Sequence, residues 1–133
     1  MAQELGIGVI GMGWMGDLHA RSYLQVPVRF PDAAILPRLV ICADEFEART
    51  NRAQQAYGFA ETTSNWRNVV THPEVDVINI TTPNNLHAEM VEAVKGLKSK
   101  SDSAQASWHA AVHAIRSKTL DPAKHSTRLL VAF

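Results

Sequence analysis

The stretch IGVIGMGWMGDLHA, residues 7–20, joins a short apolar run to a glycine-rich turn and then to a helical pattern. Its three glycines, Gly11, Gly13 and Gly16, have the spacing GxGxxG. Between a strand and a helix, the first such glycine makes a tight turn and the second lets the backbone approach a pyrophosphate. The third lets the helix pack closely against the sheet. The stretch therefore predicts the phosphate-binding turn of a dinucleotide site; the alternative is an ordinary glycine turn without a ligand.

The composition is that of an ordinary globular domain. The 133 residues suffice for one domain with a core, and 46% are hydrophobic and 20% charged. Thirteen Lys and Arg balance thirteen Asp and Glu, which gives no electrostatic argument for a nucleic-acid or membrane partner. The single cysteine, Cys42, excludes an internal disulfide. No apolar run approaches the roughly 18 residues of a membrane span, and the N-terminus lacks a signal-peptide pattern. We therefore expect a cytoplasmic protein.

Apolar runs and helical patterns alternate along the first 96 residues. Strands are predicted over 5–10, 39–43, 59–62 and 75–80, and helices over 14–26, 45–57, 64–70 and 86–95. Pro27 is expected to end the first helix, the three prolines of 27–37 to form a loop, and Ser64 to cap the third helix. Alternation of this kind predicts an α/β fold: a Rossmann-like, doubly wound parallel sheet that is incomplete at its C-terminal side.

Asp44 closes the second predicted strand, where a dinucleotide site places an acid. It lies further from the glycines than the usual distance of about 20 residues, because of the proline-rich segment. Its carboxylate would bond the adenosine ribose hydroxyls and repel a 2′-phosphate, which favours NAD as the cofactor. Two alternatives remain open: Asp44 is a helix cap, or Arg49 meets a 2′-phosphate and the cofactor is NADP.

A second cluster follows the fourth predicted strand, in the segment DVINITTPNNLHAEMVEAV of residues 76–94. Its Thr-Pro-Asn-x-x-His turn between a strand and a helix resembles that of the Gfo/Idh/MocA oxidoreductases. Three further stretches, taken in chain order, resemble motifs of that family: residues 8–20, 40–59 and 65–78. The insert at 26–38 is also similar to one branch of the family. The resemblance covers about residues 4–96.

The resemblance implies a role for each motif residue. Gly11, Gly13 and Gly16, with the amides of Trp14 and Met15, would hold the pyrophosphate of the cofactor. Asp44 would hold the ribose, and the segment Thr81, Thr82 and Pro83 would pass close to the cofactor. Asn84 would contact the nicotinamide ribose side, and His87 would lie near the site. For His87 the alternative is a helix-start residue that bonds local backbone.

The match to the family stops after Gly96. Family members continue with a Glu-Lys-Pro motif, whose lysine takes part in proton transfer, and then with a substrate domain; neither is found in this sequence. We therefore predict a dinucleotide-binding domain over 1–96 and an atypical tail over 97–133, produced by a frameshift or truncation. In the tail we expect a helix over 104–116 and an edge strand in the final apolar run. No catalytic residue and no metal site are predicted.

The resemblance implies the nicotinamide-dinucleotide-binding part of an oxidoreductase that acts on a sugar or polyol by hydride transfer, without its substrate domain. Two alternatives remain. The chain is a catalytically inactive module that binds NAD(P), alone or in association with a full-length homologue, or it is a non-functional fragment. Neither nucleic acid nor a membrane is expected as a partner.

Overall fold

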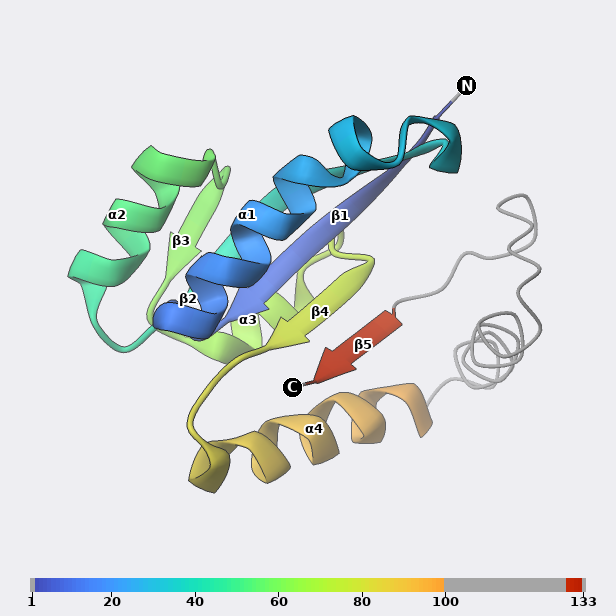
Figure 1. Ribbon diagram of the computed structural model, residues 1–133. Helices are drawn as coiled ribbons and strands as arrows, with labels where there is room; N and C mark the ends of the chain where they lie inside the picture. Colours follow the sequence, from blue (N-terminus) through green and yellow to red (C-terminus); the bar gives the residue numbers. More distant parts are fainter. Residues whose placement is uncertain (1, 100–128, 133) are drawn as a thin grey trace.

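A parallel sheet is the centre of the fold (Figure 1). The computed structural model describes residues 2–99 and 129–132. The strands are β1 (Gln3–Ile10), β2 (Ile35–Ala43), β3 (Glu61–Thr63), β4 (Val77–Ile80) and β5 (Leu129–Ala132). Their order is β3-β2-β1-β4-β5, and each adjacent pair is parallel. This is the Rossmann order through the fifth strand, so the predicted fold class is confirmed.

Within residues 2–99, four α-helices cover the two faces of the sheet. They are α1 (Trp14–Arg29), α2 (Glu47–Tyr57), α3 (Trp66–Thr71) and α4 (Asn84–Ser99), with a 3-10 turn η1 (Pro31–Ala33) before β2. Figure 1 shows α1 in front of β1 and α3 behind the sheet. None of the helices in the described part of the chain is long and apolar enough to cross a membrane.

Side chains of the central strands pack alternately into two hydrophobic cores, one on each face of the sheet. On β1, Ile7 and Val9 pack with Ala20 of α1 and Ala53 of α2. The next residue, Ile10, packs on the opposite face, where the core includes residues of α3 and α4. Continuous burial of the carboxyl-terminal parts of β1 and β2 and of β4 explains why these segments are mostly apolar rather than alternating.

Pro27 does not end the first helix, contrary to the prediction. Helix α1 continues to Arg29, and the Phe30 N–H donates to the Val26 carbonyl at 2.8 Å. A proline removes one hydrogen bond, but Pro27 lies in the last turn, where few further bonds depend on it. The helix therefore continues past it.

The prediction of a loop over 27–37 is also wrong at its second end. Strand β2 begins at Ile35, and Pro37 is one of its residues, paired with Leu5 of β1. On its other side β2 pairs with β3 only over Ile41–Ala43. Pro37 thus lies on the part of β2 that has one neighbour, where a missing N–H leaves no ladder bond unmade.

The cap of the third helix is Asn65 and not Ser64. The Asn65 side chain accepts a hydrogen bond from the Arg67 N–H at 3.1 Å, and α3 begins at Trp66. Both residue types cap helices well, and their order alone does not decide between them. At the other boundaries the elements form where predicted, within a few residues.

The apolar run near the end of the sequence forms β5, as predicted. It lies in parallel register with β4, from Val77 opposite Leu129 to Ile80 opposite Ala132. Helix α4 continues through Gly96 to Ser99. The helix predicted over 104–116 lies outside the described residues. The division into a domain over 1–96 and a tail over 97–133 remains a prediction.

Candidate functional site

A cleft of about 490 Å³ opens at the carboxyl ends of the strands. In the order β3-β2-β1-β4-β5, strands β2 and β3 are added on one side of β1, and β4 and β5 on the other. Ligands of open α/β sheets bind where the strand order reverses in this way, here between β1 and β4. Eight of the eleven residues proposed from sequence line this cleft: Gly11, Gly13, Trp14, Met15, Asp44, Thr81, Thr82 and Pro83. The other three, Gly16, Asn84 and His87, lie outside its lining.

Two of the three glycines hold the turn and the helix close to the sheet. Gly11 has a φ of +94°, which favours glycine, and its N–H donates to the Ala43 carbonyl at 2.7 Å. A Cβ at Gly11 would lie 2.8 Å from the Thr81 carbonyl oxygen. A Cβ at Gly16 would overlap the Gly11 carbonyl oxygen. The backbone of the turn therefore admits no side chain at these two positions.

Gly13 differs, because a Cβ there would meet no atom within 4 Å. It lines the cleft and is the N-cap of α1, with extended backbone and no side-chain cap. The first hydrogen bond of the helix runs from the Asp17 N–H to the Gly13 carbonyl at 3.0 Å. The N–H groups of Trp14 and Met15 precede that bond, and such groups at a helix N-terminus favour an anion. The missing Cβ keeps this end of the helix open toward the cleft.

Asp44 both fixes local backbone and borders the cleft. Its Oδ2 accepts from the Met12 N–H at 2.8 Å, and its Oδ1 accepts from the Phe46 N–H at 2.9 Å. The side chain is 6% exposed. Asp44 is not the cap of α2, because Phe46 is the N-cap residue and no side chain caps this helix; the alternative role predicted for Asp44 is therefore wrong. A carboxylate oxygen can accept more than one hydrogen bond, so each oxygen retains acceptor capacity for a ligand.

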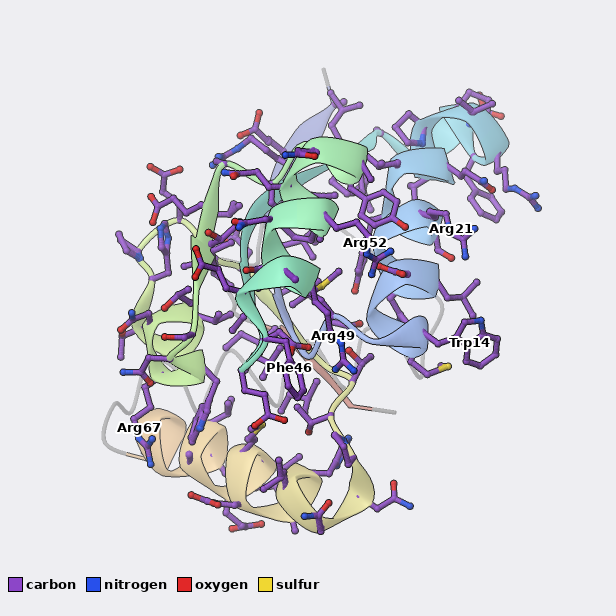
Figure 2. All side chains as sticks on the ribbon, turned by 90° about the vertical axis from the view of Figure 1, so that its left-hand side faces the viewer. Trp14, Arg21, Phe46, Arg49, Arg52 and Arg67 are labelled. Atoms are coloured by element: carbon purple, nitrogen blue, oxygen red, sulfur yellow. The ribbon has the colours of Figure 1, made fainter. Side chains whose placement is uncertain are left out.

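Arg49 reaches the same cleft from α2. Its Nη1 lies 3.6 Å from Asp44 Oδ2, and its guanidinium carbon lies 4.6 Å from the centre of the Phe46 ring. In Figure 2 the labelled Arg49 and Phe46 side chains lie together between α2 and α4. Asp44 and Arg49 therefore form an ion pair in the lining of the cleft.

The Thr-Pro-Asn segment connects β4 to α4. The Thr81 hydroxyl donates to the Gly11 carbonyl at 2.7 Å, which ties this segment to the glycine turn. The Pro83 carbonyl accepts from the N–H groups of Leu86 and His87 at 3.0 and 3.2 Å. Asn84 is therefore the first residue of α4 and not a turn residue, and it is exposed.

His87 is half-buried in the first turn of α4. Its backbone N–H bonds the Pro83 carbonyl, whereas its ring Nε2 is buried without a hydrogen-bond partner among the described residues. A buried nitrogen without a partner is rare in folded proteins. The ring is thus close to the loop that borders the cleft but is not part of the lining.

Sequence reasoning missed the wall formed by α3 and α4. Trp66 is half-buried at the start of α3 and lines the cleft together with Glu89 and Met90 of α4. The guanidinium carbon of Arg67 lies 4.4 Å from the centre of the Trp66 ring, and its Nη2 lies 3.8 Å from Glu89 Oε1. One signal was available: Trp66 follows the third predicted strand, whose carboxyl end meets the same edge of the sheet.

Cys42 of β2 is buried and Tyr23 of α1 is partly buried, and both belong to the core that includes Ile7 and Val9. Burial raises the pKa of the Cys42 thiol to about 12, and the nearby Asp44 charge adds to this. Burial likewise raises the pKa of Tyr23 to about 12, and its hydroxyl donates to Asn79 Oδ1 at 3.1 Å. Both groups stay protonated at neutral pH. Neither Cys42 nor Tyr23 lines the cleft.

The sequence and the fold both match known oxidoreductases. The family model GFO_IDH_MocA, an oxidoreductase family with an NAD-binding Rossmann fold, matches residues 5–99. Levoglucosan dehydrogenase of Pseudarthrobacter phenanthrenivorans is 37% identical over 91 residues, which are 68% of this chain and 23% of that enzyme. The chain therefore spans about a quarter of the length of this relative.

Solved structures give the same result. Levoglucosan dehydrogenase in complex with NADH superposes with a TM-score of 0.65 at 37% identity, over 69% of this chain and 25% of that one. An NAD-binding oxidoreductase from Klebsiella pneumoniae has a TM-score of 0.63 at 38% identity, over 69% of this chain and 24% of its own. The chain belongs to the Gfo/Idh/MocA oxidoreductase family and carries the family's NAD-binding Rossmann domain.

Proposed function

We propose that the cleft binds NAD(H) through the residues identified from sequence. Gly11, Gly13 and Gly16 shape the turn, and the amides of Trp14 and Met15 hold the pyrophosphate. The open position at Gly13 is the observation that carries this proposal, since a Cβ there has no protein atom within 4 Å. The N-terminus of α1 has no side-chain cap, and its free N–H groups face the cleft, where they can bind a phosphate.

The remaining contacts follow from the borders of the cleft. Asp44 receives the adenosine ribose hydroxyls on oxygens that already hold the Met12 and Phe46 N–H groups. Thr81, Thr82 and Pro83 border the cleft from the end of β4. Asn84 and His87 come next in the chain, and we place them beside the nicotinamide ribose. The His87 Nε2, which has no hydrogen-bond partner among the described residues, supports a polar neighbour on that side.

For the whole protein we propose hydride transfer to or from a sugar or polyol in the cytoplasm. The nicotinamide supplies the hydride chemistry when it is bound. This domain binds and orients the cofactor, and Thr81 fixes the turn by its bond to the Gly11 carbonyl. The proposed substrate class rests on the relative at 37% identity, which is a levoglucosan dehydrogenase.

Association with a full-length homologue is a second candidate. Strand β5 is one of the two edge strands of the described sheet and pairs there with β4 alone. An outermost strand presents N–H and C=O groups that another chain can pair with. The domain would then bind the cofactor as an inactive module. Analytical ultracentrifugation of the chain with a full-length homologue tests this: unchanged sedimentation of both would contradict it.

A substitution at Gly13 tests the cofactor site. Gly13 has extended backbone and free space around its missing Cβ, so Gly13→Ala is expected to fold normally. The new methyl group enters the space required by the pyrophosphate, and we expect NADH affinity to fall by about tenfold or more. NADH fluorescence titration measures the change.

Gly96→Ala is the matched control, because a Cβ at Gly96 also meets nothing within 4 Å and Gly96 does not line the cleft. It is expected to bind NADH like the unchanged chain. Equal affinity of Gly13→Ala and Gly96→Ala would contradict the assignment.

A further inference from the structure

The connection from α1 to β2 exposes apolar side chains at the amino end of the sheet. Every residue of the range 28–34, which we call the corner, is exposed. Most of its residues are apolar: Val28, Phe30, Pro31, Ala33 and Ala34. Val28 and Phe30 are 81% and 62% exposed. Large apolar side chains that are exposed next to one another mark a contact surface.

Backbone hydrogen bonds hold the corner in a defined shape. The Phe30 N–H donates to the Val26 carbonyl at 2.8 Å, and the Ala33 N–H donates to the Phe30 carbonyl at 3.0 Å. The Gln3 N–H donates to the Ala34 carbonyl at 2.7 Å, which ties the corner to the start of β1, where Figure 1 shows it. The apolar side chains therefore project from an ordered turn and not from a frayed helix end.

The apolar surface extends from the corner onto α1 and β2. Leu24 of α1 and Leu36 of β2 are each 45% exposed, and both line a hollow of about 350 Å³. Leu36 lies two residues beyond the corner, so the hollow adjoins it. Neither leucine and no residue of the corner lines the cleft at the carboxyl ends of the strands. The cofactor proposed above therefore does not account for this surface.

Two charges within the corner indicate what it binds. Arg29 and Asp32 are exposed and three residues apart. Arg29 donates from Nε to Gln25 at 2.9 Å, which leaves its Nη donors unused. The Asp32 carboxylate has no hydrogen bond or ion pair among the described residues. A two-fold axis at Phe30 brings Arg29 of one copy opposite Asp32 of the other on both sides, so the corner is complementary in charge to itself.

We propose that the corner is a dimerisation surface and that its occupant is a second copy of this chain. Phe30 and Val28 of the two copies pack together at the two-fold axis, and Arg29 pairs with Asp32 of the other copy. Equal numbers of acidic and basic residues give no overall repulsion between the copies. The corner is smaller than the roughly 20–30 residues that a stable interface presents on each side, so the dimer is weak.

Sedimentation equilibrium of the 133-residue chain, from about 10 µM to about 1 mM, tests the proposal. The unchanged chain should pass from monomer to dimer over this range. Phe30→Ser should raise the Kd of the dimer by about tenfold or more, because it removes the aromatic side chain at the axis. Leu18→Ser is the control, since Leu18 is an exposed apolar residue of α1 outside the corner, and it should leave the Kd unchanged.

Charge reversal tests the two-fold arrangement. Arg29→Asp and Asp32→Arg each place like charges opposite one another twice, so each variant alone should stay monomeric. An equimolar mixture of the two variants should dimerise, because every Asp then faces an Arg. Arg21→Asp makes the same change in net charge nearer the middle of α1 (Figure 2) and should dimerise like the unchanged chain.

Two results would overturn the inference. One is a chain that stays monomeric at about 1 mM, the upper limit of the titration. The other is a dimer that both single charge reversals leave intact, since such a dimer forms through a different surface, such as the edge strand β5.

Discussion

The two ends of the sheet carry similar charges but use them differently. At the amino end, Arg38 bonds Glu4 and Glu74 at 2.6 and 2.7 Å, and Asp76 accepts the Gly6 N–H at 2.8 Å. Each of these four charged side chains has a hydrogen-bonded partner at that end. These charged groups therefore pair within the protein.

At the carboxyl end the polar groups are only partly satisfied by the protein. Gly13 leaves the start of α1 open, Arg49 stands 3.6 Å from Asp44, and the His87 Nε2 has no partner among the described residues. Folding alone would favour full pairing here as well. These charged groups at the amino end thus pair within the protein, whereas at the carboxyl end the described residues leave polar groups without a close protein partner.

The largest effect on stability is expected at the carboxyl end, from Gly16→Ala. Its Cβ would overlap the Gly11 carbonyl oxygen, so the backbone of the turn must move. We expect a loss of about 3 kcal/mol in the free energy of unfolding. Urea unfolding followed by circular dichroism measures it. A loss below about 1 kcal/mol would contradict the close approach of α1 to β1.

A much smaller effect is expected at the amino end, from Arg38→Met. The Arg38 side chain is 39% exposed and its partners Glu4 and Glu74 are more so, which limits the value of both ion pairs. The loss should stay below about 1 kcal/mol, and salt should reduce it further. The affinity for NADH should not change. A weaker affinity for NADH would contradict the assignment of the cofactor site to the carboxyl end of the sheet.

The local sequence predicted those parts of the molecule that depend on neighbouring residues. The GxGxxG turn, Asp44 at the end of β2 and the alternation of strands and helices are of this kind, and the parallel sheet follows from them. The family resemblance implied that Thr81 and Thr82 pass close to the cofactor, and both line the cleft together with Gly11.

What the sequence missed depends on contacts between distant segments. The wall formed by Trp66 and Glu89 joins α3 to α4, and no local pattern reports their distance. The tolerance of Pro37 within β2 depends on the short length of β3, which is a property of the sheet. The rule that a proline ends a helix failed at Pro27. The proline removes one backbone hydrogen bond, but α1 still continues to the bond from the Phe30 N–H to the Val26 carbonyl.

We propose that the carboxyl end of the sheet, and not the amino end, binds the cofactor. Titrating NAD into the isotopically labelled chain and following its amide NMR signals tests this most directly. The account predicts large shifts for Gly13, Trp14 and Met15 and unchanged signals for Glu4 and Arg38. Shifts concentrated at the amino end, or no shifts at the glycine turn at saturating NAD, would contradict it.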